Sequence, residues 1–120
     1  MKISRQMVVF DTADLVAESS FWAAILGGTV DAEPDWHTVR VDGDARVAFQ
    51  LAPDHVQPDW PDGAPQQLHL DLYVDDISSA HAEAIAAGAR PLTALVDFDA
   101  KSGFQVYADP AGHPFCLCWG

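Results

Sequence analysis

The residues best suited to chemistry lie on two short alternating segments. In LHLDLYV, His69, Asp71 and Tyr73 alternate with leucines, and in PFCLCW, Cys116 and Cys118 alternate with Leu117 and its neighbours. Side chains at every second position of a strand share one face. An imidazole, a carboxylate, a phenol and a thiol can bind a polar ligand, transfer protons or hold a metal ion. The alternation alone fits either the wet face of an antiparallel sheet or the polar wall of a pocket.

The first half of the chain has a regular order of predicted elements. A short β-branched segment is followed by Asp14 as an N-cap, a helix with apolar residues at helical spacing, and Gly27-Gly28 as its end. The turn Asp42-Gly43-Asp44 favours a hairpin. The predicted elements are a strand at 6–11, a helix at 15–26, and strands at 29–33, 36–41 and 46–52.

The second half repeats that order after a proline-rich linker. Asp75 or Asp76 caps its helix and Gly88 stops it. Leu68, Leu70, Leu72 and Val74 form the apolar face of its first strand, which should lie under a helix. The predicted elements are a strand at 68–74, a helix at 77–87, and strands at 90–96, 103–108 and 114–119.

This repeat predicts an α+β fold of two βαβββ modules. If each mixed sheet is curled with its helix on the convex side, the two sheets surround a central cavity. The first module is assigned to residues 1–52, the linker to 53–66 and the second module to 67–120, within one domain of 120 residues. With the helices on the outer faces, the inner faces form one concave surface. The duplication therefore favours a pocket, and its predicted lining is Met7, Val9, Gln50, His69, Asp71, Tyr73 and Cys116.

Aromatic residues outside the strands are further candidates for this pocket. Trp60 lies in the proline-rich linker, where it would either cover a ligand or anchor the linker to the body, and anchoring is the favoured interpretation. Phe98 or Phe104 is expected to add apolar contacts. His37 and His55 are candidates for the border of the pocket.

The net charge and the composition indicate which classes of molecule the protein could bind and where it is expected to reside. Six basic residues against eighteen acidic ones leave a net charge of −12, which disfavours nucleic-acid binding. The acidic excess either only keeps the protein soluble, which is the favoured interpretation, or it favours a neutral or cationic small molecule. No apolar run is long enough to span a membrane, and no signal peptide is recognised at the start. We expect a cytoplasmic protein whose two cysteines are reduced.

Three segments carry a resemblance to the vicinal oxygen chelate superfamily, which includes glyoxalase I, bleomycin-resistance proteins, fosfomycin-resistance enzymes and extradiol dioxygenases. They are FDTADLVAESSFWAAILGG, HLDLYVDDISSAHAEAIAAGA and the ending VYADPAGHPFCLCW with its DPxG turn. The chain resembles most the branch known as glyoxalase-like domains. The resemblance implies paired βαβββ modules around a cavity, in a homodimer.

The resemblance also implies where a metal would bind. Metal-using members place ligands on the first, fourth, fifth and eighth strands, which correspond here to Met7, Gln50, His69 and Cys116. His69 is a suitable ligand and Gln50 a weak one, whereas Met7 is a poor ligand for a hard ion. Cys116 stands where glyoxalase I has its catalytic glutamate. As a thiolate it would suit a softer metal, with Asp71 leaning in from the strand of His69, although that set does not match the family.

These observations predict a protein that binds a small neutral or cationic organic molecule without a metal or other cofactor. The alternative is a lyase or isomerase that uses one divalent metal ion held by His69 and Gln50. His69 and Cys116 are then the candidate catalytic residues, since an imidazole beside a thiol can activate it as a nucleophile.

Overall fold

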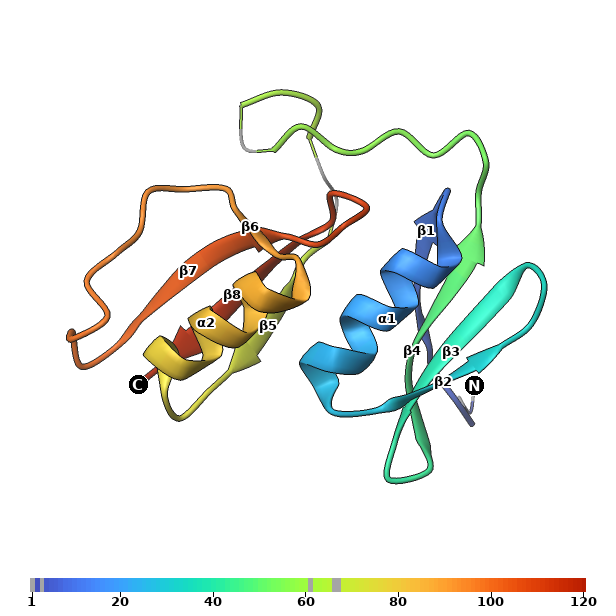
Figure 1. Cartoon of the computed structure of the whole chain (residues 1–120), viewed down its shortest axis with the longest axis horizontal. Helices are drawn as coiled ribbons and strands as arrows, with labels where there is room; N and C mark the ends of the chain where they lie inside the picture. Colours follow the sequence, from blue (N-terminus) through green and yellow to red (C-terminus); the bar gives the residue numbers. More distant parts are fainter. Residues whose placement is uncertain (1, 3, 61, 66–67) are drawn as a thin grey trace. The chain divides into compact units, whose positions relative to one another are not determined.

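The computed structural model describes residues 2, 4–60, 62–65 and 68–120. They form two compact units, Met1–His55 and Val56–Gly120, each of which contains one of the two modules. Each contains one helix and one four-stranded mixed sheet in the order βαβββ, so the predicted α+β class and the pair of similar modules are confirmed (Figure 1). None of the helices in these residues is long and apolar enough to cross a membrane.

The first module contains β1 (Val8–Thr12), α1 (Leu15–Leu26), β2 (Thr29–Ala32), β3 (Trp36–Val41) and β4 (Asp44–Leu51). The sheet order is β1-β4-β3-β2, with β1 parallel to β4 and the other pairs antiparallel. Asp42 and Gly43 both have positive φ, 51° and 84°, which is the backbone of a two-residue hairpin turn. The helix begins at the predicted cap, where the Asp14 carboxylate accepts from the Ala17 amide, and it ends at Gly27.

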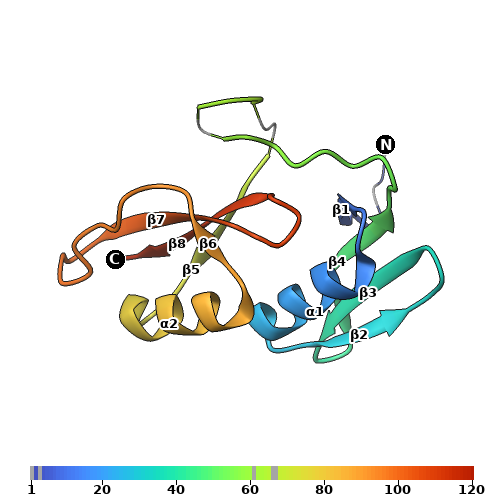
Figure 2. The same cartoon turned by 45° about the horizontal axis from the view of Figure 1, so that its top comes forward.

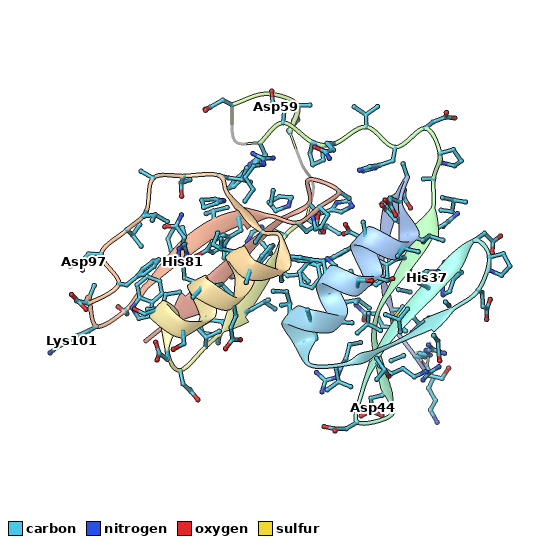
Figure 3. All side chains as sticks on the ribbon, viewed as in Figure 1. His37, Asp44, Asp59, His81, Asp97 and Lys101 are labelled. Atoms are coloured by element: carbon cyan, nitrogen blue, oxygen red, sulfur yellow. The ribbon has the colours of Figure 1, made fainter. Side chains whose placement is uncertain are left out.

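An aromatic cluster joins α1 to its sheet. The centre of the Phe10 ring lies 5.4 Å from that of Trp22 and 5.8 Å from that of Phe49, and Phe10 packs edge to face with each of them. His37 lies in this helix-covered layer, where its Nδ1 is 2.8 Å from the Ser19 hydroxyl (Figure 3). The expectation that His37 borders a pocket on the opposite face is therefore wrong within this module, because alternation along β3 points it toward the helix.

The second module contains β5 (Leu70–Tyr73), α2 (Ile77–Ala87), β6 (Arg90–Pro91), β7 (Gly103–Ala108) and β8 (Pro114–Trp119). Its sheet order is β5-β8-β7-β6, with β5 parallel to β8. In each module the helix lies along one face of the sheet (Figure 2). The helix bounds are those predicted, since Asp76 caps α2 through the Ser79 amide and Gly88 ends it in a left-handed conformation.

Side-chain contacts fasten α2 and the loop before β7 to the sheet. The Nδ1 atom of His81 is 2.7 Å from the Tyr107 hydroxyl, and the imidazole also packs against Phe98 (Figure 3). Phe98 in turn meets the Trp119 ring edge to face, and Trp119 donates from Nε1 to the Ala100 carbonyl. The charged side chains Asp97 and Lys101 lie at the outer end of the same loop (Figure 3).

Two strand predictions in this module are too long. Leu68 is predicted to lie under the helix but is 80% exposed, because it precedes β5, whose pairing starts at Leu70 opposite Phe115. Of the strand predicted at 90–96, only Arg90–Pro91 is formed. Beyond Pro91, the Leu92 amide donates to the Val106 carbonyl, and the chain at Thr93 and Val96 then bonds to the side chain of Gln105.

The Gln105 amide holds this loop by three hydrogen bonds. Its Nε2 donates to the carbonyl and the hydroxyl of Thr93, and its Oε1 accepts from the Val96 amide at 3.0 Å. Gln105 is fully buried. Loss of these partners would leave buried polar groups without compensation.

We therefore expect Gln105→Met to lower the free energy of unfolding by about 1–3 kcal/mol. Urea denaturation gives that difference, and hydrogen exchange should accelerate at the Val96 amide. Gln50→Met, at an exposed strand position of the first module, is the matched control and should change stability little. Equal stability losses in the two variants would contradict the anchoring role of Gln105.

Candidate functional site

The face of the second sheet opposite α2 carries the predicted polar residues of this module. Strand pairing places Asp71 opposite Cys116 and Tyr73 opposite Cys118, while on the other side of β8 Val106 faces Cys116 and Phe104 faces Cys118. His69 lies just before β5. The helix-covered face takes the alternate residues, among them Leu72, Leu117 and Tyr107. The register thus separates a polar and aromatic face from an apolar one.

This face is hollowed. A cavity of about 450 Å³ is lined by His69, Asp71, Tyr73, Ser102, Gly103, Phe104, Cys116, Cys118 and Trp119. Tyr73 and Phe104 are 78% and 60% exposed, which is unusual for large aromatic side chains unless they meet a ligand or partner. A Cβ at Gly103 would lie 2.7 Å from the Trp119 ring, so this close approach of the ring requires glycine at position 103.

Three polar side chains converge at one side of the hollow. The Nε2 atom of His69 is 3.4 Å from Oδ1 of Asp71, and the donor atoms of His69, Asp71 and Cys116 all lie within 4.8 Å of one another. The Asp71 carboxylate also accepts a hydrogen bond from the Cys116 thiol. His69 and Asp71 are about half exposed, whereas Cys116 is buried. We call these three residues the His–Asp–Cys cluster.

Burial and negative charge keep Cys116 protonated. Burial first, and then the charge of Asp71, raise the pKa of Cys116 to about 12, and the same two causes raise the pKa of Cys118. Both cysteines are free thiols. At neutral pH Cys116 is therefore a hydrogen-bond donor and a weak nucleophile.

Trp60 packs on the same sheet face. Together with Leu92 it contacts the buried cluster of Val106, Cys116 and Cys118. The contact attaches the proline-rich segment to the second module beside the hollow, although Trp60 is not among the residues that line it.

The remaining predicted site residues belong to the first module. Val9 lies opposite Ala48, and Gln50 lies between Asp11 and Trp36 in the sheet. Both face away from the aromatic core and are exposed, while Met7 precedes β1. The shared concave surface with the second module stays a prediction.

Sequence reasoning missed several lining residues. Ser102, Gly103 and Trp119 come from the loop end and the strand edge, where alternation does not indicate an inward face. Cys118 was recognised as a neighbour of Cys116 on one face but was not placed in the pocket. Its pairing opposite both Tyr73 and Phe104 is the signal that would have found it.

Comparison with known proteins agrees with this architecture. The profile of the glyoxalase-like domain matches residues 7–118. The chain belongs to the glyoxalase-like domain family. It is thereby a member of the vicinal oxygen chelate superfamily, as the sequence resemblance indicated. A search of curated proteins finds no match.

Solved structures share the fold of this glyoxalase-like domain at low identity. The fosfomycin resistance protein FosX from Listeria monocytogenes has a TM-score of 0.74 at 13% identity, with 100% of this chain and 93% of that chain covered. A glyoxalase/bleomycin resistance protein/dioxygenase family enzyme from Burkholderia phytofirmans PsJN has a TM-score of 0.69 at 20% identity, with 94% and 95% covered. Hypothetical protein SA1046 from S. aureus has a TM-score of 0.67 at 13% identity, with 100% and 96% covered.

Only some of the four positions that the superfamily resemblance implies carry side chains that are suitable as metal ligands. His69 and Cys116 lie together in the second module, whereas Met7 and Gln50 belong to the first and are poor or weak ligands. Asp71 adds a carboxylate beside His69 and Cys116. The resulting nitrogen, oxygen and sulfur donors fit a borderline ion such as Zn²⁺ better than a hard one.

The raised pKa of Cys116 predicts slow alkylation. In the Cys118→Ser variant treated with a chelator, iodoacetamide should modify Cys116 slowly at pH 7–8, because little thiolate is present. The rate should rise about tenfold per pH unit and level off only near the pKa of about 12. Mass spectrometry of quenched samples measures it.

Free cysteine in the same buffers is the control, since its ordinary pKa should give a plateau at lower pH. A fast reaction of Cys116 at pH 7 would contradict the protonated thiol and favour an activated nucleophile.

Proposed function

We propose that this glyoxalase-like domain binds a small neutral or cationic organic molecule in the hollow of its second module. The observation that carries the proposal is the pair of exposed rings, Tyr73 and Phe104, on either side of Cys118 on a concave sheet face. Apolar walls with a few convergent polar groups are typical of small-molecule sites. The rings would contact the apolar body of the ligand, and the polar cluster would orient it.

The charge of the site supports the choice of ligand class. Among the described lining residues there is one carboxylate, Asp71, and neither lysine nor arginine. The whole chain carries a net charge of −12, which would repel an anion before it reached the hollow. A cationic or neutral aromatic molecule meets both the rings and the carboxylate favourably.

The expected setting is the cytoplasm, and the expected assembly is a homodimer. Two free buried thiols fit a reducing compartment. The metal-dependent lyase or isomerase remains the second candidate function, and the convergence of His69 with Asp71 and Cys116 is the observation that favours it.

Three simple probes test the proposed ligand class: benzyltrimethylammonium, benzyl alcohol and benzoate. Nuclear magnetic resonance titration should show amide shifts at residues 69–73, 102–104 and 116–118 for the cation and the alcohol. Benzoate should bind least. Phe104→Ala should weaken binding of the cation by about two- to tenfold through loss of ring contact.

Asp71→Asn should reduce the preference for the cation over the alcohol by about two- to fivefold, as expected for a partly exposed charge. Leu95→Ala removes another exposed apolar side chain of the same module outside the hollow and should leave the affinities unchanged. Preferential binding of benzoate, or shifts confined to other residues, would overturn the proposal.

A further inference from the structure

Three side chains that can ligate a metal lie close together within the second module. None of them comes from Met7 or Gln50, the first-module positions that the superfamily resemblance implies. Asp71 and Cys116 are paired directly across the β5–β8 ladder, and His69 stands two residues before Asp71. The ladder therefore fixes two of the three donors relative to each other. The third is already within 3.4 Å of the carboxylate.

We propose that His69, Asp71 and Cys116 bind a divalent ion of the Zn²⁺ class, held entirely by the second module. The donor set consists of one imidazole nitrogen, one carboxylate oxygen and one thiolate sulfur. Zinc takes these three donor types, whereas Mg²⁺ and Ca²⁺ prefer oxygen ligands alone. Metals that demand several oxygens are thus disfavoured by the chemistry of the cluster.

The electrostatics of the cluster favour a cation. Asp71 faces a buried thiol, and neither lysine nor arginine is among the described residues lining the adjoining hollow. With no positive side chain there, a bound cation would stabilise the carboxylate and the thiolate together. A coordinating thiol loses its proton when the metal binds, so a high intrinsic pKa does not prevent ligation.

Three protein ligands leave one position of a tetrahedral ion for another group. All three cluster residues also line the hollow, so a small molecule in the hollow could reach that position. A structural zinc site is closed by four protein ligands, whereas a site with an open position can bind water or a polar group of a small molecule. The site proposed here is of the open kind.

The metal alone tests this inference, so the result does not depend on the proposed organic ligand. The full chain is stripped with a chelator, dialysed and titrated with Co²⁺, which substitutes for zinc and absorbs light. We expect one ion per chain, with the near-ultraviolet charge-transfer absorption of a cobalt–thiolate bond. Added Zn²⁺ should abolish the absorption by displacing cobalt.

Variants identify the ligands. Cys116→Ser should remove the charge-transfer absorption, whereas the matched Cys118→Ser should retain it. His69→Gln and Asp71→Asn should each weaken Co²⁺ binding by at least about tenfold, the loss typical even of outer-shell changes. Circular dichroism establishes that each variant is folded, and the His69 and Asp71 variants test the site if Cys116→Ser does not fold.

Either of two outcomes overturns the inference. The first is that the wild-type chain shows no cobalt–thiolate absorption at any Co²⁺ concentration. The second is that the absorption persists in Cys116→Ser and disappears in Cys118→Ser. Binding of benzyltrimethylammonium in the presence of chelator would still support the organic ligand in both cases, so the two proposals fail separately.

Discussion

The register between β5 and β8 is the constraint on which the site depends. Leu70 and Leu72 lie opposite Phe115 and Leu117 on the apolar face of the sheet, and β8, which carries the latter two, packs against α2. A shift of one residue would turn these side chains to the open face and bury Asp71 under the helix, at a large cost. Apolar burial on one face thereby determines which polar side chains meet on the other. Asp71 and Cys116 are neighbours on the open face because Leu70, Leu72 and Leu117, which alternate with them, occupy the apolar face.

That placement puts two acidic groups side by side in the hollow. Asp71 and the Cys116 thiol cannot both be ionised there without compensation, since partial burial strengthens their repulsion. A proton on the sulfur relieves the repulsion, and a divalent cation would relieve it more completely while joining His69 to the pair. In the proposed site a proton and a metal ion thus compete for the sulfur of Cys116. The metal concentration and the pH determine which of the two is bound.

Local signals were sufficient for most of the fold. Both helices have the predicted bounds because Asp14, Asp76, Gly27 and Gly88 satisfy the helix ends locally. Prediction failed where tertiary contacts decide the backbone: β6 stops at Pro91 because Gln105, distant in sequence, takes over the bonding of the following loop. Alternation placed His69, Asp71 and Tyr73 on one face of their segment, and these residues line the same hollow as Cys116 of β8. It did not indicate that Gly103 makes room for the Trp119 ring, which depends on three-dimensional packing.

A shared fold does not require a shared constellation of ligands. The three solved structures named above are 13–20% identical to this chain, a level at which the core pattern persists while individual site residues change. In this chain Met7 is a poor ligand and Gln50 a weak one, so the first module offers little to a metal ion. Asp71 pairs with Cys116 across the β5–β8 ladder and would supply a donor to the proposed site within the second module. Because one ladder holds both residues, the proposed site would need no backbone element beyond the register that the apolar face already requires.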